Sequence, residues 1–266
     1  MAERWFSEEE LREMSRPTMD RAIEAIEAGE LERARGLCEA MKHEWRFLHD
    51  LLVDGIAASM TWVKEHCGEE AVGESQRWAM ERYWKRSVRA IDSRERKEIV
   101  ELLAATWRAH SCSGTGPHPG AFTIEEDEVK VTFRMNPCGS GQRLWRMGRY
   151  EGEDGHAVTE AEHDWAYRRK GFPIYCTHCT FMNEMLPIQW IGYPVYPSDP
   201  PGDFDRVAPP CGGSVCLVSL DQRCGLVQHL PGVRQQLLHR RRKRRHGRMK
   251  HPGAQTAAGI ARRGRT

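Results

Sequence analysis

Four cysteines give the sequence the ligand types of a metal site. Cys176 and Cys179 stand two residues apart in YCTHC, a spacing that allows two thiolates to bind one cation. Cys138 and Cys211 each follow a proline, in NPCGSG and APPC, and supply a third and a fourth ligand, with His178 as a substitute. Four thiolates suit zinc and also an iron–sulfur cluster. We therefore predict a zinc or iron–sulfur site, structural when four protein ligands close it and hydrolytic when water holds one position.

Cys138 also fits the role of a catalytic nucleophile that needs no metal. The backbone amides of the next three residues would hold an oxyanion, and His163 or His178 would serve as the base. Two other interpretations compete. A CxxC pair is a redox motif in thioredoxin-like folds, although no βαβ pattern surrounds it here. Free cysteines are also among the most buried residue types, so packing alone explains the same residues.

The loop after Cys138 is a candidate binding site for an anionic ligand or cofactor. It contains Gly139, Ser140 and Gly141, and Arg143 follows closely. Successive backbone amides beside a guanidinium can cradle a negatively charged group, although a glycine-rich turn after a strand is more commonly a plain loop.

His49 and Asp50 form a His-Asp pair within a predicted long helix. In a functional interpretation, His49 is a ligand or a general base that reaches out from the helices. In the simpler interpretation it is a boundary histidine, and Arg46 pairs with Asp50 four residues along the helix. Because one His-Asp pair is a weak signal, the sequence favours the simpler interpretation.

The elements that carry these residues predict an α+β fold in which an N-terminal antiparallel helical bundle precedes a small β-hairpin and cysteine-rich module. We expect the bundle over residues 1–112, because apolar residues recur at helical spacing. The clearest helix has one apolar seam at alternating spacings of three and four, formed by Leu31, Ala34, Cys38, Met41, Trp45, Leu48 and Leu52.

The module is expected over residues 113–211, after a loop rich in Gly, Pro and Ser. Alternating apolar residues over 121–135 predict a hairpin that turns at Glu126-Asp127. A short helix is expected over 159–170, because its first turn is acidic and its last turn is basic. Further helical turns are expected over 176–185, ended by Pro187.

Three segments, NPCGSGQRL, GFPIYCTHC and APPC, resemble bacterial proteins grouped with the L-2-amino-thiazoline-4-carboxylic acid hydrolases. The resemblance covers residues 120–211 and implies a small α+β fold and a cysteine-based hydrolase of C–N or C–S bonds. It also implies an aromatic strand directly after the last of these cysteines, which this chain does not have.

The charge of the chain is divided. Residues 212–266 contain thirteen Lys and Arg and one acidic residue, and no Phe, Trp or Tyr, although the whole chain carries only +2. We expect this basic tail to be disordered, because it lacks the apolar residues of a core. HRRRKRRHGRMK would bind nucleic acid through phosphates. A frame shift in a GC-rich gene would produce the same composition, so the tail is also interpreted as out-of-frame sequence.

The remaining features indicate a protein that stays in the cytoplasm and does not bind membranes. The start, MAERWFSEEE, has neither the basic nor the apolar region of a signal peptide, and no apolar run approaches the roughly 20 residues of a membrane span. In a reducing compartment the nine cysteines are free thiols or metal ligands. The expected partner is a small-molecule substrate, with nucleic acid bound only if the tail is native.

Overall fold

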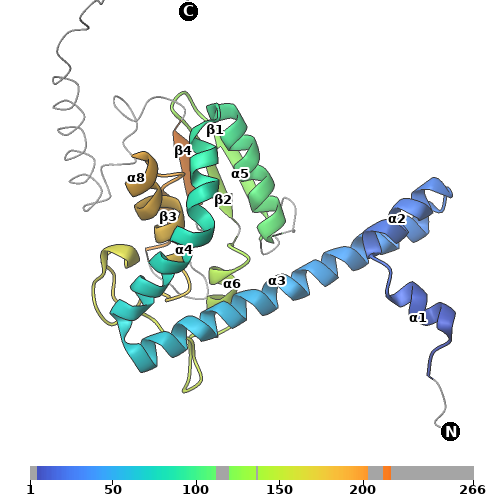
Figure 1. Cartoon of the computed structure of the whole chain (residues 1–266), viewed down its shortest axis with the longest axis horizontal. Coiled ribbons are helices and arrows are strands. Elements are labelled where there is room, and N and C mark those ends of the chain that lie inside the picture. The colour runs from blue at the N-terminus through green and yellow to red at the C-terminus, as the bar shows by residue number, and fades with distance from the viewer. Residues whose placement is uncertain (1–4, 112–119, 136, 203–211, 217–266) are drawn as a thin grey trace, which may run out of the picture.

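A computed structural model describes residues 5–111, 120–135, 137–202 and 212–216. The fold is α+β, as predicted: long N-terminal helices precede a small antiparallel sheet (Figure 1). The helices are α1 (Glu8–Met14), α2 (Thr18–Glu27), α3 (Leu31–Cys67), α4 (Glu69–Asp92), α5 (Arg96–Ser111), α6 (Gly141–Arg146), α7 (Thr177–Thr180) and α8 (Leu186–Ile191), with a 3₁₀ turn η1 (Asp164–Ala166) and a π turn η2 (Phe181–Met185). The strands are β1 (Phe122–Glu126), β2 (Lys130–Met135), β3 (Ser198–Asp199) and β4 (Gly212–Cys216).

Helix α3 is the longest element, with 37 residues, and its N-terminal half extends away from the rest of the molecule (Figure 1). The predicted apolar seam begins under α2, where Ala22 and Ala25 of α2 and Ala34 of α3 are buried. The start of α2 is tied to α3 by Thr18, whose hydroxyl donates to the Glu44 carboxylate at 2.8 Å. Helix α2 therefore runs antiparallel to α3 and covers only the first part of the seam.

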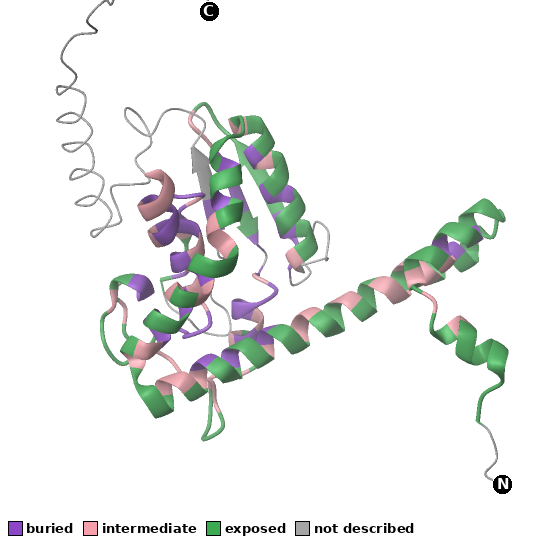
Figure 2. Cartoon of the chain, in the orientation of Figure 1, coloured by how far each residue is buried: buried purple, intermediate pink, exposed green. Residues whose placement is uncertain are grey.

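The main hydrophobic core lies between α4, α5 and the sheet, as the buried residues in Figure 2 show. It combines residues from both sides of the predicted 112/113 boundary: Val88, Ile91, Ile99, Leu103, Trp107, Phe122, Val131 and Phe133. This packing stabilises the hairpin, which alone buries too little apolar surface to be stable in water.

The sheet has the strand order β1-β2-β4-β3, with every neighbour antiparallel. The predicted hairpin is confirmed. Its turn is held by Asp127, whose Oδ1 accepts the N–H groups of Val129 and Lys130 at 2.8 and 3.0 Å. Strand β4 corrects one prediction, because its five residues belong to the segment expected to be disordered. The pairing of β4 with β2 uses backbone groups, so a strand forms there without an aromatic residue. Residues 217–266, the rest of the predicted tail, lie outside the described part of the chain.

The helix predicted over 159–170 is wrong. Only Asp164–Ala166 form a helical turn, and Tyr167 and Arg168 then take left-handed backbone angles, with φ of 55° and 54°. The segment instead closes on itself. Thr159 exchanges backbone hydrogen bonds with Phe172 (2.9 Å) and Gly171 (2.7 Å). The favourable charge pattern contributes only a few tenths to 1 kcal/mol, so these contacts outweigh it.

Pro187 does not end the helical segment that begins at Thr177. The chain continues from α7 through η2 into α8, where Pro187 lies in the first turn. A proline there leaves the carbonyl four residues earlier without its usual donor. That carbonyl belongs to Asn183, and it accepts the N–H of Val195 at 2.8 Å. A bond from outside the helix thus replaces the missing one. Among the described helices, none is both long and apolar enough to cross a membrane.

Candidate functional site

A group of polar side chains meets at the place where the middle of α3, the end of α5 and the loop before α6 come together. They border a cavity of about 250 Å³ beside α3. Its walls are largely apolar, and its polar groups come from His49, His110 and Tyr175. The complete lining is Trp45, Leu48, His49, Leu52, Val53, Ile56, His110 and Tyr175. Ser140 is almost fully buried behind these polar rings.

Asp50, His49 and Ser140 form a continuous hydrogen-bonded line. Asp50 Oδ1 lies 2.9 Å from His49 Nδ1, and His49 Nε2 lies 3.0 Å from Ser140 Oγ. The carboxylate can only accept, so Nδ1 carries the proton and Nε2 is free to accept the serine hydroxyl proton. This is the arrangement of acid, base and hydroxyl found in serine hydrolases, which are identified by geometry rather than by residue order.

His110 approaches the same hydroxyl from α5. Its Nε2 lies 3.0 Å from Ser140 Oγ, and its ring is 5.0 Å from that of His49 in an edge-on contact. Because His49 accepts the hydroxyl proton, His110 must donate its own N–H to the oxygen. Burial, with smaller effects of His49 and His178, lowers the pKa of His110 to about 4. His110 is therefore a neutral donor at neutral pH.

Arg143 fixes the position of Asp50. Its Nε lies 3.0 Å from Asp50 Oδ1, and its Nη2 donates to Asp54 Oδ2 at 2.8 Å. Arg149 binds the other oxygen of Asp54 at 3.1 Å. The guanidinium predicted to cradle an anionic ligand thus faces two carboxylates of α3, and it joins α6 to α3. The ion pair with Arg143, which is largely shielded from water, holds the Asp50 carboxylate in one orientation.

Cys138 lies below the loop, and its surroundings favour the neutral thiol. The backbone N–H of Ser140 points at its sulfur at 3.5 Å, while its own N–H donates to the side chain of Gln142 at 2.9 Å. Burial raises the pKa of Cys138, and the nearby Cys179 adds to the increase. Among the described residues, no histidine hydrogen-bonds to the Cys138 sulfur. The described contacts of the thiol thus include no general base, and the cysteine mechanism stays a prediction.

The CxxC segment packs directly against the glycine-serine loop. The Cys176 sulfur occupies the space that a Cβ on Gly141 would need. His178 Nδ1 is bonded to the Tyr175 carbonyl at 2.5 Å, and His178 Nε2 lies 3.5 Å from the Cys179 sulfur. Burial lowers the pKa of His178 and raises that of Cys179 to about 12, so both groups are neutral near pH 7.

The metal site stays a prediction. Within the part of the chain that the structure describes, no three His, Cys, Asp or Glu side chains are arranged as a group that could hold a metal ion. Cys211, the predicted fourth ligand, lies outside the described residues. Among the described residues, Cys138, Cys176 and Cys179 form no disulfide.

His163 lies in a different environment from the one predicted. Its Nε2 is 2.7 Å from Glu69 and its Nδ1 is 3.5 Å from Glu70, both at the start of α4, and its ring stacks on Trp165. Glu69 also accepts the N–H of Ala161 at 3.1 Å. The structure therefore gives His163 a part in joining a loop to α4 in place of the predicted role as a base.

Sequence reasoning missed His110 and Tyr175, and it favoured a passive role for His49. No local motif marks these residues, because the site forms only when three distant segments pack together. The strand, the Gly-Ser-Gly turn and the helix that follow one another around Ser140 were the one available signal. Comparison of the chain with protein-family models, curated proteins and solved structures finds no match.

Proposed function

We propose that this protein is a hydrolase of small acyl compounds, cleaving a C–N or C–S bond with the Ser140 hydroxyl as nucleophile. The observation that carries the proposal is the line from Asp50 through His49 to Ser140, with its 2.9 and 3.0 Å contacts. The largely apolar cavity beside it favours a substrate with an apolar acyl group, such as an amide or a thioester.

In the proposed acyl transfer, Ser140, His49 and Asp50 each have a defined role. Ser140 Oγ attacks the carbonyl carbon while its proton passes to His49 Nε2, and Asp50 stabilises the imidazolium that forms. His49 then gives this proton to the leaving nitrogen or sulfur as the C–N or C–S bond breaks. Water attacks the acyl-serine in the same way, releasing the acid and restoring the hydroxyl.

In this proposal Tyr175 stabilises the charge that develops on the carbonyl oxygen. Its side chain is buried, lines the cavity and interacts with Ser140. Burial raises the pKa of Tyr175, with a further increase from Cys138 and Cys179, so the hydroxyl remains protonated and able to donate. Such donors contribute most where water is excluded.

A panel of 4-nitrophenyl esters, aryl thioesters and anilides with short apolar acyl groups tests the proposal. We expect hydrolysis by the unaltered protein and a loss of at least about 10²-fold in kcat with Ser140→Ala. Ser59→Ala is the control, since Ser59 is an exposed residue of α3 whose hydroxyl donates to the Gly55 carbonyl. Equal activity of Ser140→Ala and the unaltered protein would overturn the serine mechanism. Loss of activity only with Cys138→Ala would favour the cysteine nucleophile instead.

A further inference from the structure

Helix α1 has an apolar face that contacts no core. It has no buried residue, and its segment exposes Trp5 (89%), Phe6, Leu11 and Met14. Its first turn is fixed by a capping box in which Ser7 and Glu10 bond each other's backbone N–H groups. A helix of seven residues is not stable alone in water, so packing of its apolar side is expected.

The cavity beside α3 has an apolar wall that is equally exposed. Leu48 and Leu52 remain 54% and 56% exposed, and Ile56 lies one turn further along. These residues continue the seam that α2 covers at its other end. In Figure 2 the burial of α3 is greatest where it meets the body and at α2, with exposed residues between. The proposed substrate cavity is therefore open on the side of Leu48, Leu52 and Ile56.

The connection between α1 and α2 lies at the edge of that gap. Thr18, the first residue of α2, is bonded to Glu44, which immediately precedes Trp45 of the cavity. Because α2 runs antiparallel to α3, the line of α2 continued back beyond Thr18 leads along α3 toward Ile56, whereas α1 itself is turned away from the body (Figure 1). The distance from Trp45 to Ile56 is about 16 Å along the helix, and Trp5–Met14 span about 14 Å if helical. The segment thus has the length of the gap.

We propose that Trp5–Met14 close over the cavity by rotation at Ser15–Pro17, so that Trp5 and Leu11 form the missing wall and contact the apolar acyl group of the substrate. This inference rests on the proposed hydrolase function for the identity of the ligand, but the closure itself does not. It makes α1 a determinant of acyl-chain length.

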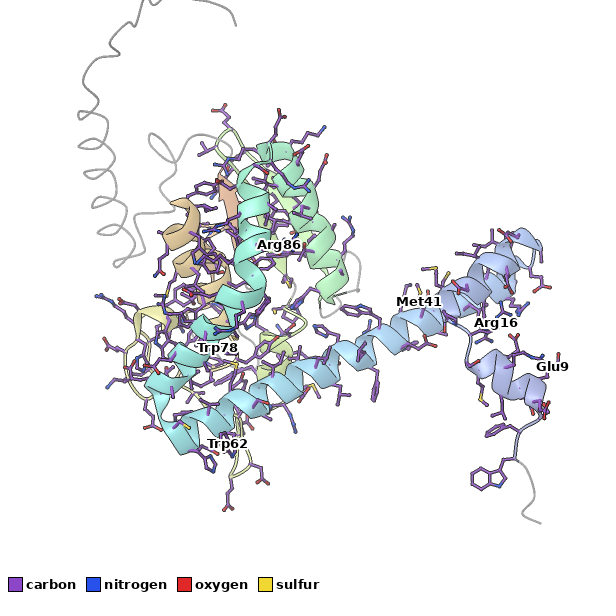
Figure 3. All side chains as sticks on the ribbon, viewed as in Figure 1. Glu9, Arg16, Met41, Trp62, Trp78 and Arg86 are labelled. Carbon is purple, nitrogen blue, oxygen red and sulfur yellow. The ribbon has the colours of Figure 1, made fainter. Side chains whose placement is uncertain are left out.

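Few interactions oppose the rotation. Glu13 lies 2.9 Å from Arg16 and 3.7 Å from Arg21, and Arg16 also pairs with Glu24 of α2, so these partly exposed ion pairs join α1 to the following segment. Figure 3 shows Arg16 between the two helices and Glu9 at the far end of α1. Exposed ion pairs contribute little to stability. The free energy lost when they break is therefore smaller than the free energy gained when closure buries apolar surface.

Photo-crosslinking of the full chain tests the closure without relying on activity. Leu11 is replaced by p-benzoylphenylalanine, and the control carries the same group at Glu9, which is on the opposite side of α1. We expect crosslinks from position 11, but not from position 9, to residues 45–56, increased by octanoate. A mixture of ¹⁴N- and ¹⁵N-labelled protein shows which chain is captured. No crosslinks to residues 45–56, or crosslinks only between chains, would overturn the proposal.

The consequence for specificity has a separate readout. With Trp5→Ser and Leu11→Ser combined, we expect kcat/KM for octanoyl esters to fall about 10-fold or more relative to kcat/KM for acetyl esters. Equal losses for both esters would contradict the role of α1 in acyl binding. If no ester is hydrolysed by any form of the protein, the proposed function fails, and the crosslinking result still decides whether α1 closes.

Discussion

His49 Nε2 lies 3.0 Å from Ser140 Oγ, although the two residues are 91 positions apart in the chain. Two sets of contacts keep them together. Arg143 of α6 binds Asp50 and Asp54 of α3, and Leu144 is packed against Val53 and Ala57 one turn further along. The base and the hydroxyl are therefore carried by two elements whose relative position is fixed by both charge and packing.

Replacing the base tests this relationship. His49→Gln keeps a polar side chain of similar size but cannot accept and return a proton, so kcat should fall by about 10²–10⁴-fold. His66→Gln is the control, because His66 lies on the same helix and bonds only the Trp62 carbonyl. Steady-state kinetics with a 4-nitrophenyl ester gives the comparison. Similar kcat values for the two variants would remove His49 from the mechanism.

Cys138→Ala separates the serine mechanism from both cysteine hypotheses. Its sulfur faces backbone N–H groups of the loop, that of Ser140 at 3.5 Å, and burial raises its pKa, so kcat should change by less than about 10-fold. Elemental analysis and an absorption spectrum of the purified chain are measured in parallel. One zinc or one iron–sulfur cluster per chain, lost together with activity in this variant, would support the predicted metal site against the serine mechanism.

Gly141 is required by the contact between the two loop segments. A Cβ at this position would overlap the Cys176 sulfur and approach the Tyr175 ring to 3.5 Å. We expect Gly141→Ala to lower the free energy of unfolding by about 1–3 kcal/mol in urea denaturation. Gly36→Ala, at a helical position with nothing within 4 Å, should instead raise it by up to about 1 kcal/mol. The same sign for both changes would contradict the packing described.

Glu184 should make stability depend on pH. Burial raises its pKa to about 7, against the hydrogen bonds from Ser198 and Tyr167, which lower it. The folded state thus holds a proton that the unfolded state releases near pH 4.5, so the stabilisation is complete below pH 4.5 and is lost as pH rises to 7. The loss is about 3 kcal/mol.

Glu184→Gln cannot release this proton. The difference in the free energy of unfolding between this variant and the unaltered protein should therefore shift in favour of the variant from pH 5 to pH 8. Glu65→Gln, at an exposed position of α3, provides the control. A difference that is constant with pH would show that Glu184 titrates at its ordinary value.

The elements that could be predicted from sequence are those whose pattern is local. Helix α3 and the β1–β2 hairpin follow from apolar spacing and from an Asp at the turn, and both are present, although Leu31, Leu48 and Leu52 of the predicted seam are exposed. The segment 159–170 could not be predicted in this way. Its conformation depends on pairing with Phe172, which the charge pattern of an isolated helix does not contain.

The site was predictable only in part, for the same reason. The Gly-Ser-Gly turn and the CxxC segment were identified by composition, and the structure places them in contact. The choice between Cys138 and Ser140 depends on which of them faces an imidazole. The packing of α3 and α5 on the loop decides which side chain faces the imidazole. The spacing of residues within the loop could therefore not predict the choice.

The serine mechanism is tested most directly by a fluorophosphonate, which forms a covalent bond with an activated serine, followed by mass spectrometry of the digested protein. We predict one adduct per chain on Ser140, which is abolished by His49→Gln and retained by His66→Gln. An adduct on another residue, or no adduct under conditions where esters are hydrolysed, would contradict the assignment of Ser140 as the nucleophile.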